Sequence, residues 1–376
     1  MKQKICIVGD GLTGLTTAIV LGKLNIKVEL IAPNFKKRTN DKRTTAISQS
    51  NYNFLIEFLG KNIEKLFWPC KKIDLYHETS NINKNFMSFE DQGRNLMYVI
   101  ENKKLKNFLK KEINKNNNIK IINKKMKRID ARTSQVFFEK KRQFYDLIFL
   151  CVGKKSNMID NLIGKRYVQN DTKEVAITTV VKHKQKILNA RQYFFKEGPL
   201  AILPLSNNSF SLVWSLNRNF DIKNIGDLIT KKLRTILNKS KRFNFSKIHS
   251  FPISLRFNVN SKKNNILVLG EGSHNIHPIA GQGYNLILRD IKALHNEIQN
   301  FLSIGMQLKE SQILNNFVNT RKPENFIFGF GIDLINRFFN ENKIPVSFRS
   351  VILKDIDQFK FLKKLSLNLS NRGIFN

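Results

Sequence analysis

Residues 5–14 read Ile-Cys-Ile-Val-Gly-Asp-Gly-Leu-Thr-Gly, and this stretch decides the fold class. Its first four residues are apolar and predict a buried strand. Three glycines follow with the spacing of a tight turn, and helix-period apolar residues begin at Leu15. Val28-Glu29-Leu30-Ile31, which is apolar except for Glu29, predicts the next strand. A strand, a glycine-rich turn and a helix in this order are typical of a Rossmann-type dinucleotide-binding unit, because glycine lets the backbone and the helix N-terminus approach a pyrophosphate. The candidate contacts are Gly9, Gly11, Leu12, Thr13 and Gly14.

A second glycine-rich segment, residues 270–285, follows a predicted strand at residues 266–269. Glu271 stands just after that strand, where an acid can hold a ribose or ribitol hydroxyl group. Pro278 stiffens the turn, while Gly281 and Gly283 let backbone N–H groups approach a ring at a helix start, which favours negative charge there. We therefore expect this segment to return to the first domain and to contact the same cofactor.

The remaining pattern predicts an α/β protein with a discontinuous nucleotide-binding domain. Strands and helices alternate at first, with one helix at residues 101–115, whereas residues 174–257 are rich in strands and hold one helix near residues 228–237. From about Phe317 we expect helices broken at Pro323 and Pro345. The expected division is a nucleotide-binding domain (1–70, 98–165 and 261–320), a β-sheet substrate domain (71–97 and 166–260) and a C-terminal helical region (321–376).

Composition excludes several classes of protein. With 376 residues and 41% hydrophobic residues the chain can form a full-sized core, so disorder is excluded. The net charge of +36 is spread along the chain together with much Asn, Ile and Phe. We interpret it as compositional bias, since no nucleic-acid-binding signature accompanies it. A predicted strand starts almost at once, so no secretion leader is expected, and no apolar run is long enough to span a bilayer.

The metal-binding and disulfide patterns are weak. The three cysteines, Cys6, Cys70 and Cys151, have no CxxC or CxxH neighbour, which favours a reducing, cytoplasmic location without structural zinc. His274 and His277 have HxxH spacing but no third ligand, so we expect no metal. Hydrogen bonds that shape the surrounding loop are the role expected for these two histidines.

Several motifs along the chain resemble the class A flavoprotein aromatic hydroxylases and, within them, the ubiquinone-biosynthesis hydroxylase family. The most specific motif is His-Pro-Ile-Ala-Gly-Gln-Gly-Tyr-Asn at residues 277–285, followed by Leu288, Arg289 and Asp290. The others are the opening fingerprint, residues 43–48, 98–102, 198–205 and 211–214, and Arg321 with Asn325.

This resemblance implies a doubly wound FAD domain, a β-sheet substrate domain, and NADH or NADPH as electron donor. It also implies that dioxygen is used to hydroxylate a polyprenylated phenol or quinol intermediate of ubiquinone biosynthesis. Arg43 is expected to contact the flavin and Glu271 the ribityl or pyrophosphate region. The residues expected around the isoalloxazine ring are Pro278, Gly281, Gln282, Gly283 and Asn285.

Three residues depart from the family pattern. Ala32 stands where a ribose-binding acid is expected, Glu271 replaces an Asp, and Val152 replaces an Asp in the middle motif. Two alternatives therefore stay open. One is a catalytically silent member that supports a complex with other ubiquinone-biosynthesis proteins, and the other is a hydroxylase of a soluble aromatic acid. A buried Arg or Lys in the substrate sheet would favour the soluble acid.

The C-terminal sequence carries an apolar stripe at helical spacing, with lysines beside it. We expect this segment either to pack on the flavin domain or to rest on the inner face of the cytoplasmic membrane as a peripheral contact. The stripe consists of Phe348, Ile352, Ile356, Phe359, Leu362, Leu365 and Leu369.

Overall fold

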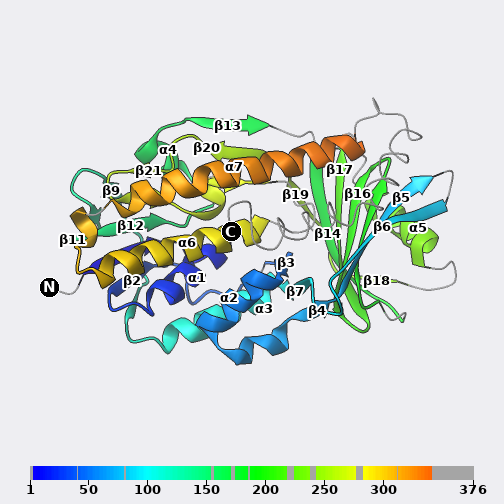
Figure 1. Ribbon diagram of the computed structural model, residues 1–376, viewed down its shortest axis with the longest axis horizontal. Helices are drawn as coiled ribbons and strands as arrows, with labels where there is room; N and C mark the ends of the chain where they lie inside the picture. Colours follow the sequence, from blue (N-terminus) through cyan, green and yellow to red (C-terminus); the bar gives the residue numbers. More distant parts are fainter. Residues whose placement is uncertain are drawn as a thin grey trace.

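The nucleotide-binding half is built on a parallel sheet, seen on the left of Figure 1. The structure is a computed structural model and describes residues 3–39, 41–79, 82–153, 156–170, 174–184, 187–217, 224–237, 243–276, 283–310 and 312–340. The parallel strands lie in the order β22 (Ile266–Val268), β12 (Leu147–Leu150), β1 (Lys4–Val8), β2 (Lys27–Ile31) and β8 (Ile119–Ile122). A short antiparallel strand, β21 (Lys262–Lys263), pairs with β22. In chain order the parallel strands run 5-4-1-2-3, so the direction of winding reverses between β1 and β12, where such sheets bind dinucleotides.

Apolar side chains cover both faces of this sheet. On one face the core joins alternate strand residues to α1 (Leu12–Leu21), α3 (Asn102–Asn114) and α6 (Gly283–Ser303). On the other face it joins α4 (Asn157–Ile163) and the small sheet of β9 (Arg128–Asp130), β10 (Gln135–Phe137) and β11 (Arg142–Phe144). Burial on both faces explains why β1, β12 and β22 have almost entirely apolar sequences, whereas β2 and β8 carry Glu29 and Lys120.

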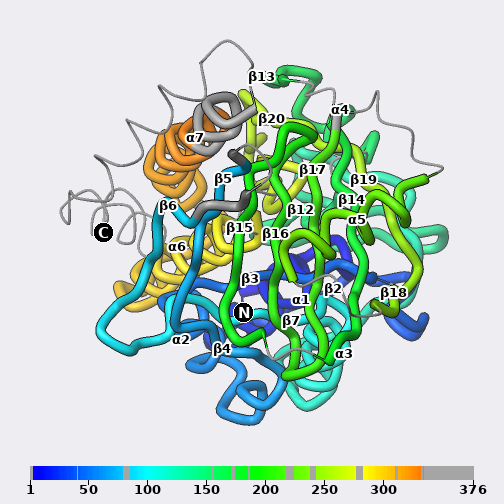
Figure 2. The backbone as a smooth tube through the Cα atoms, turned by 90° about the vertical axis from the view of Figure 1, so that its right-hand side faces the viewer, coloured from blue at the N-terminus to red at the C-terminus, as the bar shows by residue number. Residues whose placement is uncertain are grey.

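The second large sheet stands at the right of Figure 1 and faces the viewer in Figure 2. Its strands follow the order β18 (Asn244–Phe245), β14 (Glu174–Lys182), β17 (Ser209–Asn217), β16 (Gly198–Ser206), β15 (Ala190–Phe195), β5 (Lys72–Thr79) and β6 (Ile82–Glu90), with β19 (His249–Pro252) also paired to β14. The outer face packs on α5 (Ile225–Leu237). Phe194, Phe195, Leu203 and Trp214 lie in strands of this sheet, as the sequence pattern predicted.

Two smaller sheets and a helical layer complete the structure. The first consists of β3 (Thr44–Ser48), β7 (Met97–Glu101) and β4 (Trp68–Cys70), and the second of β13 (Tyr167–Asn170), β20 (Leu255–Asn258) and β23 (His274–Asn275). Between β3 and β4 lie α2 (Gln49–Leu59) and a 3-10 helix (Lys61–Leu66). Further 3-10 turns occupy Gly270–Gly272 and Leu308–Glu310.

The helix α7 (Ile313–Asn340) corrects one prediction. We expected a break at Pro323, but α7 runs through this residue and extends alongside α6 (Figure 1). Proline removes one backbone hydrogen bond, and buried bonds from Arg321 and Asn325 to Asp290 on α6 hold the helix on both sides of it. Pro345 and the apolar stripe from Phe348 to Leu369 lie outside the described residues. Within the described ranges, no helix combines the length and apolar character that crossing a bilayer requires.

Candidate cofactor site

The turn after β1 needs glycine at two positions for steric reasons. Gly9 has a φ of +123°, and a Cβ atom there would lie 2.3 Å from the carbonyl oxygen of Cys151. A Cβ atom on Gly14 would lie 2.0 Å from the carbonyl oxygen of Gly9. Both glycines therefore let α1 pack closely against the ends of β1 and β12, as the fingerprint requires.

Gly11 meets a different requirement, because the space beside it is open. Its φ of −74° suits any residue, and among the described residues no heavy atom lies within 4 Å of a Cβ built there, neighbours in the chain aside. Gly11 also precedes α1, and no described side chain caps this helix end. The first N–H groups of a helix have no intrahelical partner and carry a partial positive charge. The turn therefore presents an open anion-binding surface.

The two glycine-rich segments meet at Thr13. Gly270 has a φ of +83°, and a Cβ atom there would lie 2.7 Å from Thr13 Oγ1. Thr13 and its neighbour Leu12 are both half-buried. Sequence segments some 260 residues apart thus form one surface, which agrees with the expectation that the second segment returns to the first domain.

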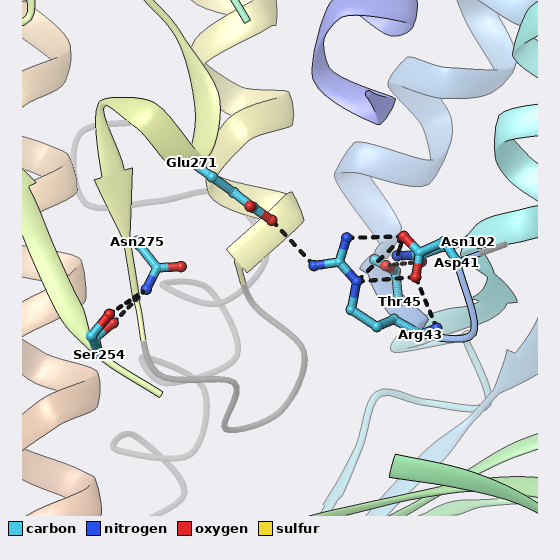
Figure 3. Close-up of polar contacts among 7 residues, drawn as sticks. All are labelled: Asp41, Arg43, Thr45, Asn102, Ser254, Glu271 and Asn275. Carbon is cyan, nitrogen blue, oxygen red and sulfur yellow. Dashed lines mark hydrogen bonds and ion pairs between the residues drawn. The ribbon is translucent and has the colours of Figure 1, made fainter. Parts of the chain in front are cut away.

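Arg43 bridges two acidic residues at the edge of this surface, as Figure 3 shows. Its guanidinium donates from Nε to Asp41 Oδ1 at 3.0 Å and from Nη2 to Asp41 Oδ2 at 2.9 Å. Its Nη1 donates to Glu271 Oε1 at 3.4 Å. The side chains of Arg43 and Glu271 are each 45% exposed, so both can still reach a ligand.

Asp41 is a residue that the sequence analysis did not single out. Burial opposes its ionisation, yet the hydrogen bonds and the charge of Arg43 outweigh burial and lower the pKa of Asp41. Asn102 also donates to Asp41, and Thr45 donates to Asn102. The available signal was the position of Asp41, two residues before Arg43 and the family motif at residues 43–48.

A second missed feature is a pair of lysines on α3. Lys106 lies one turn before Lys110, and its Nζ is 4.0 Å from Asp10 Oδ1 in the glycine turn. Lys110 donates to the carbonyl oxygen of Lys37, and its pKa is lowered by burial and by the charge of Lys106. These cations lie near the region where the ribose-binding acid was expected.

The structure describes only some of the residues that are predicted to contact the isoalloxazine ring. Pro278, Gly281 and Gln282 lie outside the described residues, and Gly283 is the first residue of α6. The Asn285 side chain is buried: its Oδ1 accepts from Ser48 N at 2.9 Å, and its Nδ2 donates to Ala46 O at 2.8 Å. It therefore ties α6 to β3, and its predicted flavin contact stays a prediction.

The departures from the family pattern occupy different surroundings. Ala32 is fully buried in the core shared with α1 and α3, and its methyl side chain offers no group that binds a ribose hydroxyl. Val152 is half-buried against the apolar cluster beneath α4.

His274 is buried, and neither ring nitrogen forms a hydrogen bond to a described residue, although Nδ1 lies 3.6 Å from Asp290 Oδ2. The expectation that His274 shapes the loop through hydrogen bonds is therefore wrong.

These observations fit FAD as the cofactor. The open turn at Gly11 and the uncapped α1 suit a pyrophosphate, while Arg43 and Glu271 offer a hydrogen-bonding pair at the next position along the surface. The longer side chain of Glu271 reaches Arg43, and its predicted contact with the cofactor stays a prediction. The site lies at the carboxyl ends of β1, β12 and β22, where this class of sheet binds its ligand.

Comparisons with known proteins agree with this geometry. Residues 4–247 match the family model of glucose inhibited division protein A, and residues 217–351 match that of squalene epoxidase. The chain is 25% identical to ubiquinone biosynthesis monooxygenase COQ6 of Dictyostelium discoideum, over 97% of this chain and 90% of the relative. It is 30% identical to 3-demethoxyubiquinol 3-hydroxylase of Escherichia coli, over 47% of this chain and 46% of the relative.

The fold is shared with solved flavoprotein structures. p-Nitrophenol 4-monooxygenase PnpA of Pseudomonas putida superposes with a TM-score of 0.82 at 15% identity, covering 99% of both chains. The Klebsiella pneumoniae protein HpxO, whose structure contains FAD and uric acid, has a TM-score of 0.74 at 12% identity over 98% of this chain and 97% of its own. The chain belongs to the glucose inhibited division protein A family of FAD-binding proteins, and its relatives include the ubiquinone-biosynthesis hydroxylases.

Proposed function

We propose that this protein is an FAD-dependent monooxygenase that hydroxylates the aromatic ring of a polyprenylated phenol or quinol in ubiquinone biosynthesis. The names of its relatives support the reaction class and the pathway. NADH or NADPH is the proposed electron donor and dioxygen the co-substrate. The single structural observation that carries the substrate class is the chemistry of one face of the second sheet.

This inner face is turned away from α5 and toward the β3–β7–β4 sheet. Ala190, Ala201 and Leu203 on the inner face share an apolar cluster with Ala46, Met97 and Val99 of that smaller sheet. Strand register then assigns the other inner positions, because side chains alternate between faces and paired residues share a face. The central inner positions are Ile73, Leu75, Ala176, Thr178, Ala190, Gln192, Phe194, Ala201, Leu203, Ser211, Val213 and Ser215.

None of these inner-face residues is charged. A soluble aromatic acid would require a cation to balance its carboxylate, since an unpaired charge in a poorly solvated site is costly. A neutral phenol with an apolar tail requires none. The Arg43 guanidinium lies 5.8 Å from the ring of Phe251, which pairs in register with Ala176, but Asp41 and Glu271 already balance its charge. The uncharged inner positions therefore support the prenylated phenol over the soluble acid.

Polar atoms on the inner face can orient the ring. Thr178 Oγ1 and Ser211 Oγ are buried without a hydrogen-bond partner among the described residues. His249 pairs in register with Thr178, and its Nε2 is likewise buried without a described partner. Buried polar groups gain most from a partner when none is present, so we propose that these three side chains bind the substrate's ring oxygens.

The protein supplies binding, orientation and exclusion of water. When bound, FAD supplies the redox chemistry, taking electrons from the nicotinamide and delivering them to dioxygen. The Gly11 turn and the start of α1 hold the pyrophosphate, and Arg43 with Glu271 fixes the neighbouring part of the cofactor. The apolar inner face keeps water away from the ring, which protects a reactive oxygen species from side reactions.

A catalytically silent role is the second candidate, and one observation favours it. The core position of Ala32 leaves the ribose without its usual acid. For an active enzyme, we propose instead that Lys106 and Lys110 on α3 make the polar contacts to the ribose that this acid would otherwise make. Purified protein that stays colourless after incubation with FAD would support the silent role in a complex with other ubiquinone-biosynthesis proteins.

The proposed substrate suggests where in the cell the protein acts. A polyprenyl tail resides in the bilayer, so we propose a cytoplasmic protein that binds peripherally to the inner face of the cytoplasmic membrane. The C-terminal apolar stripe is the proposed contact, and the lysines beside it favour anionic lipid.

A substrate comparison tests the proposal. FAD-loaded protein is assayed for product and for coupled NADH and NADPH oxidation with a short-chain prenylphenol and with 4-hydroxybenzoate. We expect turnover of the prenylphenol alone. Leu203→Arg, which adds a cation to the inner face, should reduce prenylphenol turnover at least tenfold, whereas the uncharged control Leu203→Met should retain it. Equal turnover of both substrates by the unmodified protein would contradict the neutral-substrate proposal.

A further inference from the structure

We propose that a pocket between β20 and α7 is a second binding site, for a neutral, hydroxyl-bearing aromatic amphiphile of the phenol or quinol class. The pocket has a volume of about 400 Å³, which is large enough for an aromatic ring and several carbons. Gly9 to Gly14, Arg43 and Glu271 do not line it. The inference does not depend on the proposed monooxygenase activity.

The walls of the pocket are apolar. Phe257 of β20 faces α7, and its ring lies 5.5 Å from that of Phe326. Apolar walls of this kind bind hydrocarbon or an aromatic ring and give little gain to a hydrated ion. The apolar lining consists of Val168, Phe257, Val259, Val268, Leu269, Phe317, Val318, Pro323 and Phe326.

Two buried side chains in the lining have unused hydrogen-bonding atoms. Asn258 is 3% exposed; its Nδ2 donates to Gly272 O, while its Oδ1 has no partner among the described residues. His274 is 4% exposed, and neither ring nitrogen forms a hydrogen bond to a described residue. Burial lowers the pKa of His274, so its ring is neutral and offers one donor and one acceptor.

This pair of residues specifies the ligand's polar group. Asn258 Oδ1 can only accept, so the ligand must carry a donor. His274 can donate to the same ligand oxygen or accept from a second hydroxyl group. A phenolic or quinolic hydroxyl group satisfies both residues, whereas a hydrocarbon satisfies neither and an anion repels Asn258 Oδ1.

Three charged residues line the pocket: Asp290 and Arg321 are buried and pair with each other, whereas exposed Lys322 donates from Nζ to the carbonyl oxygen of Val259. Arg321 Nε donates to Asp290 Oδ1 at 2.8 Å, and Asn325 Nδ2 donates to both carboxylate oxygens of Asp290 at 3.0 and 3.1 Å. Arg321 Nη2 also donates to Asn325 Oδ1. Because the buried charges of Asp290 and Arg321 balance each other and Lys322 is exposed to solvent, the buried part of the pocket favours a neutral ligand.

Several exposed apolar side chains line the mouth of the pocket, beside the exposed Lys322. Val168 is 53% exposed, Val259 40% and Phe326 41%. Ile327 and Phe330 on α7, 50% and 47% exposed, continue this apolar strip beyond the lining. A ligand whose hydroxyl group reaches His274 can therefore place an alkyl or prenyl chain along the strip.

Histidine NMR on the full-length, FAD-loaded protein tests the proposal. The probes are 4-pentylphenol and pentylbenzene, which share the apolar body and differ in the hydroxyl group. His274→Phe identifies the His274 ring signals in protein labelled with ¹⁵N-histidine. We expect 4-pentylphenol to shift these signals saturably and pentylbenzene to bind at least tenfold more weakly.

Two variants separate this pocket from other binding. His274→Phe keeps an aromatic ring beside Phe257, and it should weaken 4-pentylphenol binding at least tenfold without changing pentylbenzene binding. Val259→Trp fills the mouth, keeps both polar groups, and should abolish the His274 shift. Unmoved His274 signals at saturating 4-pentylphenol would show a pocket that holds water alone and would overturn the proposal. FAD content and hydroxylation are measured separately, so failure of the proposed function leaves this result interpretable.

Discussion

Gly11 and Gly9 belong to the same turn for different physical reasons. Gly9 has a positive φ and no room for a Cβ atom, so its substitution disturbs the fold. Gly11 has an ordinary φ and open space beside it, so the protein itself tolerates a side chain there. We therefore propose that the ligand, and not the fold, requires glycine at Gly11, a distinction that the sequence motif alone does not reveal.

We predict that Gly11→Asp abolishes FAD binding and leaves the chain folded. The new carboxylate occupies the space where the pyrophosphate must approach and repels its charge. Bound flavin is measured by absorbance and folding by circular dichroism. The control Gly226→Asp places the same residue in α5, where a Cβ atom meets only Ile248 at 4.0 Å, and should keep its flavin. Stoichiometric FAD in Gly11→Asp would remove this turn from the cofactor site.

Arg43→Ala should weaken FAD binding by about 1–3 kcal/mol, the value of a hydrogen bond to a charged group. The substitution also leaves Asp41 and Glu271 without their shared cation, so two carboxylates then face the cofactor. Fluorescence titration with FAD measures the effect. Lys42→Ala removes the same charge from an exposed neighbour and should have almost no effect. Equal affinities of the two variants would exclude a specific role for Arg43.

Helices α6 and α7 show what sequence reasoning misses at the scale of the element. Proline breaks an isolated helix, and we accordingly predicted a break at Pro323. Helix α7 continues through Pro323 because Asp290 on α6 binds Arg321 and Asn325, which lie on either side of the proline. Asp290 is more than 30 residues away from both in the sequence. Helix α3, whose apolar residues follow a clear period, was predicted within one residue at each end.

Arg321→Met should destabilise the protein by about 3–5 kcal/mol, because it leaves the buried carboxylates of Asp290 and Glu324 without their shared cation. Urea denaturation measures the change. The exposed neighbour Lys322→Met should cost less than about 0.5 kcal/mol. The double variant Asp290→Leu with Arg321→Met should recover only part of the loss, since it removes the Asp290 carboxylate but leaves that of Glu324 without its cation. A loss for Arg321→Met no larger than that of Lys322→Met would contradict the role given to the buried pair.

For the whole molecule, the sequence motifs predicted the chemistry of the protein better than they predicted its side-chain contacts. The glycine turn, the strands around it and the β-rich middle segment follow from local patterns, and the structure confirms them. The Arg43–Asp41–Glu271 bridge, the unpaired atoms of Thr178 and Ser211, and the pocket beside α7 depend on segments far apart in sequence. The division into domains with the stated boundaries stays a prediction.

The membrane proposal is tested with the C-terminal segment. Truncation after Ser347 should leave FAD bound but reduce sedimentation with anionic liposomes, since each lysine at such a surface contributes about 1 kcal/mol. High salt should weaken liposome binding by the intact chain, because dissolved ions screen the attraction between its lysines and the anionic lipid. Liposome binding that is equal for both chains would exclude this segment as the anchor. Loss of FAD on truncation would instead support packing of the segment on the flavin domain.

The most direct test of the monooxygenase account is isotope incorporation. FAD-loaded protein, a reduced nicotinamide and a short-chain prenylphenol are incubated under oxygen-18 gas, and the product is analysed by mass spectrometry. The account predicts a hydroxylated ring that carries one labelled oxygen atom, with little product from the Gly11→Asp variant. Reduced nicotinamide consumed with hydrogen peroxide as the sole product, or a hydroxyl group without label, would contradict it.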